Sequence, residues 1–383
     1  MTYNKNTTCI LPWIALDRNA DSSTPAFAPC CLYQAQDKPK YTFEEYWHSK
    51  ELIKIKEEMR NGIKPNGCWK CWHDEDAGKK SMRQSVNESR LLVHEEAIQK
   101  DSRELKPIQV KLLASASCNL ACRMCQSHVS SKVFKVWEAI GRVTKEPYKY
   151  DYDSENIIRE NAESIRYIDL MGGEPFYHKR VHGLIDWLVE NKHSEHITIY
   201  VTTNAMLLND SLISNLKQFE NVVVIVSLDA VGKKHEYIRP GADWNTIVSN
   251  IERLQENKLN VIIQPVISAI NILCLPELID WCRQRKLHMT QMCLVHNPDE
   301  LHPKNLPSAL RHLVDSQFKS FLSEDKTIDC LEFIKKLDKH WNTKIYDVMP
   351  EWKEVYNKKG KGDTLEKDYD LYRRTLEYVN KIS

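Results

Sequence analysis

The chain reads Cys118-Asn119-Leu120-Ala121-Cys122-Arg123-Met124-Cys125 just after an apolar, strand-like run at 108–114. Three thiolates can hold only three irons of a four-iron cubane, so the fourth iron keeps an open position for a non-protein ligand. A short loop can wrap one face of such a cube, and Met124 can offer an apolar contact to a molecule docked there. This stretch therefore predicts an iron–sulfur site that supports chemistry, with a zinc knuckle or a chance spacing as the alternatives.

The composition limits the classes of function. The chain has 383 residues, of which 42% are apolar, and its 54 basic and 53 acidic residues give a net charge of +1. This balance argues against a dedicated nucleic-acid or acidic-membrane binder. The start of the chain is polar and has no signal-peptide pattern, and the longest apolar stretch, 261–275, is interrupted by polar residues. Twelve cysteines without a secretion signal favour metal ligation in a reducing cytoplasm over disulfides.

Strand and helix patterns alternate from about residue 107 onward. The strand candidates are 108–114, 165–171, 197–203, 222–228, 261–268 and 289–295. Helix candidates lie between several of them, at 181–192, 210–219, 244–257 and 275–285. Such alternation predicts an α/β fold with a parallel sheet and outer helices. Six strands predict a partial (β/α)6 barrel, because a complete barrel of this type needs eight.

The remaining segments suggest further parts of the molecule. Residues 1–90 form a predicted N-terminal domain with five cysteines and one helix, or two short ones, over 41–61. A charged linker at 91–106 leads to the barrel at 107–300, which carries a long insertion at 134–161. Residues 301–383 are predicted to be a helical extension, with helix candidates at 310–322 and 330–341.

Further polar motifs stand where predicted strands end. Gly172-Gly173-Glu174-Pro175 follows the second strand, and glycines there let a backbone approach a ligand while the carboxylate accepts from an ammonium group. Asn204 ends the third strand, and Ser227 and Asp229 end the fourth. In barrels of this kind, ligand-binding residues gather at the carboxyl ends of strands. Arg239 can clamp a carboxylate of a bound cofactor with two hydrogen bonds, or it can form a surface ion pair.

These motifs resemble the radical S-adenosylmethionine (SAM) superfamily. The spacing of Cys118, Cys122 and Cys125 matches the family's cluster loop in full, with Met124 in the slot that is often aromatic. The resemblance implies that the open iron of a [4Fe-4S] cluster chelates SAM, that the G-G-E motif ending in Glu174 binds the SAM amino group, and that the reduced cluster cleaves SAM to a 5′-deoxyadenosyl radical.

The resemblance also implies roles for the later strand ends. Asn204, Ser227 and Asp229 stand where the family contacts the ribose hydroxyls and the carboxylate of SAM. The family often has T-N-G and S-x-D-G at these two places. This chain departs from both patterns, because Ala205 and Ala230 stand where the glycines are expected. Capping of the strand ends is the alternative role for these polar residues.

The N-terminal cysteines resemble the "twitch" or SPASM-type auxiliary-cluster module, which usually follows the barrel and here precedes it. Four thiolates can close a second [4Fe-4S] cluster, and they also suit zinc. The predicted ligands are Cys9, Cys30, Cys68 and Cys71. Adjacent cysteines cannot both easily point at one cubane, so we expect either Cys30 or Cys31 to be spare and favour Cys30 as the ligand.

The resemblance therefore predicts a cytoplasmic radical SAM oxidoreductase acting on a peptide or a small natural-product precursor. The auxiliary cluster would aid oxidation, and a reductant such as ferredoxin or flavodoxin would supply electrons. No nucleic-acid or membrane partner is expected. The alternatives are a redox-neutral epimerase or mutase, a sulfur-inserting enzyme on a sugar, nucleoside or peptide, and a non-catalytic iron–sulfur or zinc protein. Cys293, near the end of the sixth strand, is a weak candidate for a hydrogen-atom donor.

Overall fold

The computed structural model describes residues 4, 6–19, 26–34, 41–100, 106–290, 292–322, 328 and 330–357. One eight-stranded sheet has the order β2-β1-β3-β4-β5-β6-β7-β9, and a second sheet pairs β10 with β8. The pairings of β1 with β3, β3 with β4, β4 with β5, β6 with β7 and β7 with β9 are parallel, whereas β1 and β2 are antiparallel. The fold is thus mixed α/β with a largely parallel sheet, consistent with a TIM-like barrel.

The strands confirm the predicted positions and add two more. They are β1 (Ala15–Asn19), β2 (Ala26–Ala28), β3 (Gln109–Leu113), β4 (Tyr167–Met171), β5 (Thr198–Thr203), β6 (Asn221–Val226), β7 (Asn260–Ile263), β8 (Val266–Ile267), β9 (His288–Met289) and β10 (Cys293–Leu294). The fifth and sixth predicted strands are each divided in two, and the pieces β8 and β10 pair with each other. The pattern of alternation did not reveal β1 and β2, which lie in the predicted N-terminal domain.

The helices largely follow the sequence periodicity. They are α1 (Leu11–Ile14), α2 (Phe43–Trp47), α3 (Lys50–Arg60), α4 (Trp69–Asp76), α5 (Met82–Arg90), α6 (Glu95–Gln99), α7 (Ser131–Ala139), α8 (Tyr152–Glu160), α9 (Lys179–Glu190), α10 (Asp210–Leu216), α11 (Gly232–Ile238), α12 (Trp244–Glu256), α13 (Leu275–Gln284), α14 (Cys330–Trp341) and α15 (Lys353–Asn357). Side-chain caps fix several starts, such as the capping boxes of Thr42 with Glu45 and of Ser81 with Gln84. None of the helices in the described segments has the length and apolar content needed to cross a membrane.

The prediction of one continuous helix at 310–322 was wrong. The structure has two short 3-10 segments there, at Ser308–Leu313 and Ser316–Phe321. Val314 between them is extended, and the Asp315 side chain accepts a hydrogen bond from the backbone N–H of Gln317, which starts a new turn. Local side-chain capping therefore interrupts the helical periodicity. The end of the predicted extension, 358–383, lies outside the described residues.

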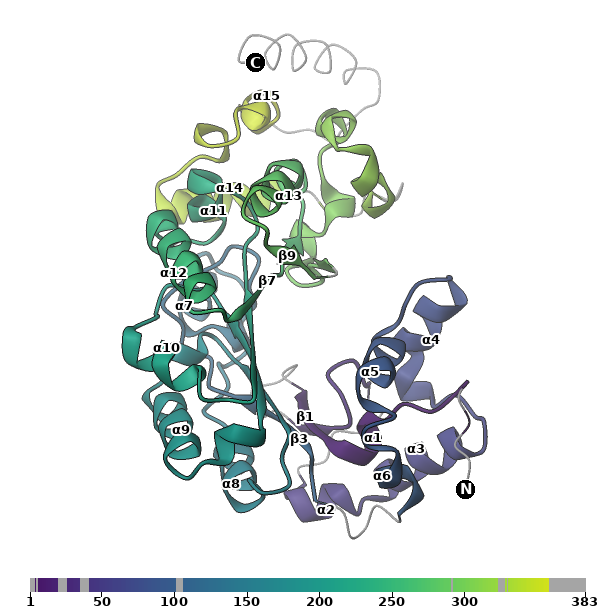
Figure 1. The fold of residues 1–383 in the computed structure, drawn as a ribbon. Coiled ribbons are helices and arrows are strands. Elements are labelled where there is room, and N and C mark those ends of the chain that lie inside the picture. Colours follow the sequence, from purple (N-terminus) through teal and green to yellow (C-terminus); the bar gives the residue numbers. More distant parts are fainter. Residues whose placement is uncertain are drawn as a thin grey trace. The chain divides into compact units, whose positions relative to one another are not determined.

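The chain divides into two compact units. The first comprises Met1–Ala116, Tyr148–Val201 and Ser214–Val222. Figure 1 shows its N-terminal helices (purple to blue) gathered around α1 beside β1. Their shared core contains Ile10, Trp13 and Met59, all of them fully buried. Burial of such side chains is the main source of stability for this part of the unit.

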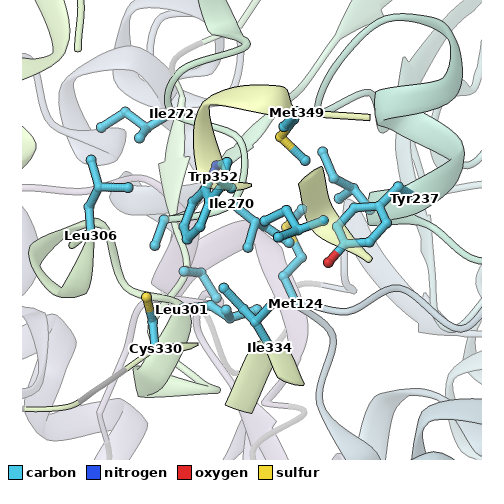
Figure 2. Close-up of a cluster of buried hydrophobic side chains, with 14 of the residues drawn as sticks. Met124, Tyr237, Ile270, Ile272, Leu301, Leu306, Cys330, Ile334, Met349 and Trp352 are labelled. Atoms are coloured by element: carbon cyan, nitrogen blue, oxygen red, sulfur yellow. The ribbon is translucent and has the colours of Figure 1, made fainter. Parts of the chain in front are cut away.

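The second unit comprises Ser117–Pro147, Thr202–Ile213 and Val223–Ser383. Its core packs the loop after β3 against later parts of the chain, and Figure 2 shows Met124 and Tyr237 among side chains of α14 and of the segment that follows it. Trp352 and Ile270 lie in the same cluster and are almost fully buried. The C-terminal segment up to 357 therefore completes this core.

Candidate functional site

The three-cysteine loop, residues 118–125, is held by backbone hydrogen bonds to the segment 238–241. The N–H groups of Ala121 and Arg123 donate to the carbonyls of Pro240 and Ile238, at 3.0 and 2.9 Å. Gly241 has a φ of +95°, and a Cβ there would lie 3.3 Å from the Asn119 carbonyl oxygen. Glycine thus permits the close approach of two backbones that fixes the loop.

The cysteines of this loop form a suitable donor set for an iron–sulfur group. All twelve cysteines of the chain are free thiols. Cys118 is buried, while Cys122 and Cys125 are half-buried, and the Cys125 N–H donates to the Cys122 carbonyl at 3.1 Å. Among the described residues, no group of three or more His, Cys, Asp or Glu side chains is arranged to hold a metal ion. A cubane spreads its thiolates over separate irons, so its ligands stand farther apart than the ligands of one ion.

A buried ion pair lies beside Cys122. The Arg239 guanidinium donates to the Asp229 carboxylate at 2.5 Å, and its Nη1 lies 3.7 Å from the Cys122 Sγ. Burial raises the pKa of the Cys122 thiol, and the charge of Arg239 acts in the opposite direction. The nearby cation therefore favours the thiolate that a metal ligand requires. Of the two roles considered for Arg239, the structure shows an ion pair, but a buried one.

The Asp229 carboxylate is engaged within the chain. Its second oxygen accepts a hydrogen bond from the Val266 N–H at 2.9 Å, and its backbone carbonyl accepts from the Asn271 side-chain amide at 3.1 Å. Together with the bond from Arg239, these contacts use both carboxylate oxygens. In this arrangement Asp229 orients Arg239, which is a different use from the predicted contact with a bound cofactor.

Two more predicted cofactor residues lie at strand ends in the same unit. The Asn204 amide donates to the Asn119 side-chain oxygen in the three-cysteine loop at 2.8 Å. The half-buried Ser227 follows β6, and its N–H donates to the Thr203 carbonyl at 2.9 Å. Ala205, in the place of the expected glycine, has a left-handed φ of +58°. The backbone conformation that a glycine would serve is therefore kept without one.

The Gly-Gly-Glu turn belongs to the first unit. Gly172 has a φ of +151°, and a Cβ there would lie 2.9 Å from the Ser115 carbonyl oxygen, to which the Gly173 N–H donates at 2.8 Å. The glycine is thus required by both conformation and space. The buried Glu174 side chain accepts a hydrogen bond from the Phe176 N–H at 3.2 Å. This bond fixes the direction of the carboxylate at the end of β4.

Met124 and Cys293 have contrasting surroundings. Met124 is 7% exposed and packs in the apolar core of the second unit (Figure 2). The structure therefore assigns its side chain to packing, and a contact with a docked molecule stays a prediction. Cys293 is exposed in the short strand β10. Exposure is compatible with a reactive thiol but does not by itself indicate one.

The N-terminal cysteines converge on one pocket of the first unit. Its empty volume is about 330 Å³, and its lining comprises Cys9, Cys30, Leu32, Met59, Cys68, Cys71, Met82 and Arg83. We call it the four-cysteine pocket. Burial raises the pKa of Cys9 to about 12, and burial also raises the pKa values of Cys30, Cys68 and Cys71. Neutral thiols are therefore stable there without a metal, and a bound metal would stabilise the thiolates instead.

Cys31 does not line the four-cysteine pocket. It is exposed, and its sulfur lies 3.9 Å from the Met82 sulfur. Its electrostatic neighbours are Lys111 and Asp17, which form a buried ion pair at 2.6 Å. Cys30 is thus the member of the adjacent pair that faces the other three cysteines.

Sequence reasoning missed the polar support of the four-cysteine pocket. The buried Arg83 donates to the Thr8 carbonyl, next to Cys9, at 2.8 Å, and it forms an ion pair with the half-buried Glu75 at 2.6 Å. The Arg83 guanidinium also stacks 4.8 Å from the Trp72 ring centroid. The positions of Arg83 and Glu75 in a charged, helical stretch gave no local signal of burial, because their partners lie in other turns and segments.

The comparison with known families found one match. The family model described as "Radical SAM superfamily" matches residues 113–288, which include the three-cysteine loop and the Gly-Gly-Glu turn. No curated protein sequence matches the chain.

Several solved structures are similar to the chain at low identity. "Native anSMEcpe with bound AdoMet" is 19% identical, covering 50% of this chain and 52% of that one, with a TM-score of 0.39. "Crystal structure of Streptococcus suis SuiB bound to S-adenosylmethionine" is 17% identical, covering 76% and 57%, with a TM-score of 0.39. The methyltransferase TsrM from Kitasatospora setae is 10% identical, covering 48% and 36%, with a TM-score of 0.34. The chain spans little more than half the length of the first two.

Proposed function

We propose, from the premise that residues 113–288 form a radical SAM superfamily domain, that this chain is a radical SAM oxidoreductase with two iron–sulfur clusters. Its substrate would be a peptide or a small natural-product precursor, and a small electron-transfer protein such as ferredoxin or flavodoxin would reduce it. The auxiliary cluster, the substrate class and the net oxidation are parts of this proposal.

One observation carries the proposal. Three cysteines that form no disulfide lie on one eight-residue loop that follows a parallel strand, and a buried arginine stands 3.7 Å from the middle sulfur. Three thiolates leave one iron of a cubane without a protein ligand. Arg239 is held by Asp229, so its charge is fixed beside Cys122 before any metal binds. An iron–sulfur protein that only stores or transfers electrons has no need of an open iron.

The residues of the chain would bind and orient SAM, while the bound cluster would supply the electron that cleaves its carbon–sulfur bond. The carbonyls and carboxylate of the Gly-Gly-Glu turn are acceptors for the SAM amino group. Asn204, which touches the three-cysteine loop through Asn119, and Ser227 are polar groups for the ribose hydroxyls and the carboxylate. The buried surroundings of the loop would exclude water from the reactive radical.

The four-cysteine pocket would hold the auxiliary cluster through Cys9, Cys30, Cys68 and Cys71. Its lining is apolar apart from the thiols and Arg83, which suits a cluster with four protein ligands. The guanidinium of Arg83 would offset part of the negative charge of four thiolates. In the proposed reaction this site takes the electron left on the substrate, so that the net change is an oxidation.

The test is an anaerobic assay with reconstituted full-length chain, dithionite and SAM, in which release of 5′-deoxyadenosine is measured. We expect release by the wild type and none by Cys122→Ala. Cys293→Ala serves as a control for a thiol outside the loop, and we expect it to retain release. Absence of the nucleoside from protein with about eight irons per chain would instead support a non-catalytic iron–sulfur protein.

A second arm tests the auxiliary site. The double variant Cys68→Ala/Cys71→Ala should keep some SAM cleavage and lose product formation, and full product from this variant would exclude a role for the pocket in the reaction. With candidate peptides, loss of two hydrogens from the product supports oxidation. Uptake of one solvent deuterium without a mass loss would instead support an epimerase.

A further inference from the structure

The three-cysteine loop contains a charged residue that is buried in the second unit. Arg123 lies between two of the cysteine ligands, and its side chain is 1% exposed. Its Nε donates to the Tyr237 carbonyl at 2.7 Å, and the guanidinium lies 3.9 Å from the Tyr237 ring centroid. A buried guanidinium is costly unless its charge is compensated and its donors are used.

The compensating charge comes from the C-terminal segment. Asp338 in α14, also 1% exposed, has its carboxylate 3.1 Å from the Arg123 Nη1, and the Thr343 hydroxyl accepts from Nη2 at 2.7 Å. The Asp338 carboxylate accepts hydrogen bonds from Tyr237 at 2.9 Å, from Thr343 at 3.0 Å and from the Ile345 N–H at 3.0 Å. Every oxygen of this buried carboxylate is therefore used within one network.

The next loop residue is anchored in the same place. Met124 packs in the core cluster that includes Ile334 and Leu337 of α14 (Figure 2). An ion pair and a shared apolar core thus connect two consecutive loop residues with a helix about 210 positions later in the sequence. A helix that only covered the barrel would not need a buried ion pair with Arg123, which lies between Cys122 and Cys125.

We propose that Asp338, acting through Arg123, is a positioning residue for the cluster of the three-cysteine loop, and that the C-terminal segment therefore controls how firmly the cluster is held. The proposal rests on the proposed function, because it presumes a cluster on this loop. Residues that orient metal ligands without touching the metal commonly change metal retention when they are replaced.

The experiment separates positioning from folding. The single variants Asp338→Asn and Arg123→Met each leave a buried group without its partner, so they are expected to lower the melting temperature. The double variant Arg123→Met/Asp338→Asn removes both charges and keeps a side-chain oxygen that can accept from Tyr237 and Thr343. We expect the double variant to be more stable than either single variant but to release the iron of this cluster to a chelator roughly tenfold faster than the wild type.

The readouts are iron release and the electron-spin resonance signal of the reduced protein. Subtraction of the signal of Cys122→Ala identifies the part that belongs to the three-cysteine loop. The matched control is Glu332→Ala, which removes an exposed ion pair with Lys336 from the same helix, and we expect it to behave as the wild type.

A double variant with the iron release and spin signal of the wild type would overturn the positioning role. A wild type that shows no cluster on this loop would instead overturn the proposed function, so the two failures are distinguishable. Asp338→Glu provides a rescue test, since it keeps the charge and should restore more of the spin signal than Asp338→Asn does.

Discussion

Single residues explain how this chain departs from the sequence pattern of the family that its motifs resemble. Ala205 and Ala230 both stand where a glycine is expected, but the structure treats them differently. Ala205 has a φ of +58°, whereas Ala230 is not among the residues with positive φ and is fully buried in the apolar core. The first position needs the backbone conformation of glycine, and the second needs the methyl group.

This difference predicts unequal effects of the same substitution. Ala205→Gly and Ala230→Gly each remove a fully buried methyl group and add chain entropy. Only Ala205→Gly also relieves a left-handed backbone, so it should lower the free energy of unfolding by about 1 kcal/mol less than Ala230→Gly does. Urea unfolding of both variants measures the two effects, and an equal loss of stability in both would contradict this account of Ala205.

The adjacent cysteines provide a second prediction at this scale. Cys30→Ala should lower the iron content of the reconstituted protein by about four irons per chain, because Cys30 lines the four-cysteine pocket. Cys31→Ala is the matched control and should keep the iron content of the wild type, since Cys31 is exposed and directed at Met82. Equal iron contents in the two variants would argue that the ligand is not fixed by the pocket.

At the scale of elements, α4 and α5 are joined by charge. Arg83 of α5 pairs with Glu75 of α4 and reaches the backbone beside Cys9. Burial acts to raise the pKa of the Glu75 carboxyl, but hydrogen bonds from Arg83 and Ser81 outweigh it and leave that pKa below its ordinary value. A carboxyl whose pKa is lower in the folded protein than in the unfolded chain stabilises the fold at a pH above its pKa in the unfolded chain. This stabilisation is lost as the pH falls through its pKa in the folded protein.

Replacement of Glu75 should change how the free energy of unfolding depends on pH in the acidic range. Glu75→Gln should lower the stability of the metal-free protein at neutral pH and flatten its loss of stability below a pH of about 4.5. Glu88→Gln, which removes an exposed pair with Lys80, is the control and should change little. Denaturant unfolding between pH 3 and pH 7 measures both, and parallel profiles for Glu75→Gln and the wild type would exclude the proposed linkage.

Elements also show what the sequence could predict. Alternation located all six barrel strands, and helical periodicity located α9, α12 and α13 within two residues of their observed ends. The same reasoning missed β1, because a five-residue strand next to a short helix has no period long enough to recognise. It also gave a helix at 310–322, where the capping by Asp315 that starts a second 3-10 segment is a local bond that periodicity does not report.

The candidate site was predicted less completely than the fold. Spacing predicted the three cysteines of the loop as ligands, and the resemblance to auxiliary-cluster modules predicted four of the five N-terminal ones. The supporting charges Arg123, Asp338 and Arg83 could not be predicted, because each is paired with a residue in another element. Burial of a charged side chain depends on tertiary contacts, and the sequence around it looks like an ordinary exposed helix or loop.

At the scale of the whole molecule, the predicted N-terminal domain is not closed on itself. β1 pairs in parallel with β3, and two buried ion pairs, Lys111 with Asp17 and Arg18 with Asp151, connect it to later parts of the first unit. In each pair, one residue belongs to 1–90 and the other to the region after residue 90. Separation of residues 1–90 from the rest of the chain would leave these buried charges without partners.

We therefore predict that residues 1–90 expressed alone do not fold. Circular dichroism and amide-proton dispersion in NMR spectra should show an unfolded chain, with or without added iron and sulfide. The full-length protein under the same conditions is the control. A cooperative thermal transition of the isolated fragment would contradict this prediction and would support an independent domain.

The pairing of β1 with β3 has one more consequence, for solubility. Without β1, the five-residue strand β3 would expose a row of unpaired backbone groups at the margin of the sheet, where a second chain could add a strand. With β1 and β2 in place, that margin is a strand of only three residues, and the opposite margin, β9, has only two. We therefore expect the N-terminal segment to protect the protein against edge-to-edge aggregation, independently of any role of its cysteines.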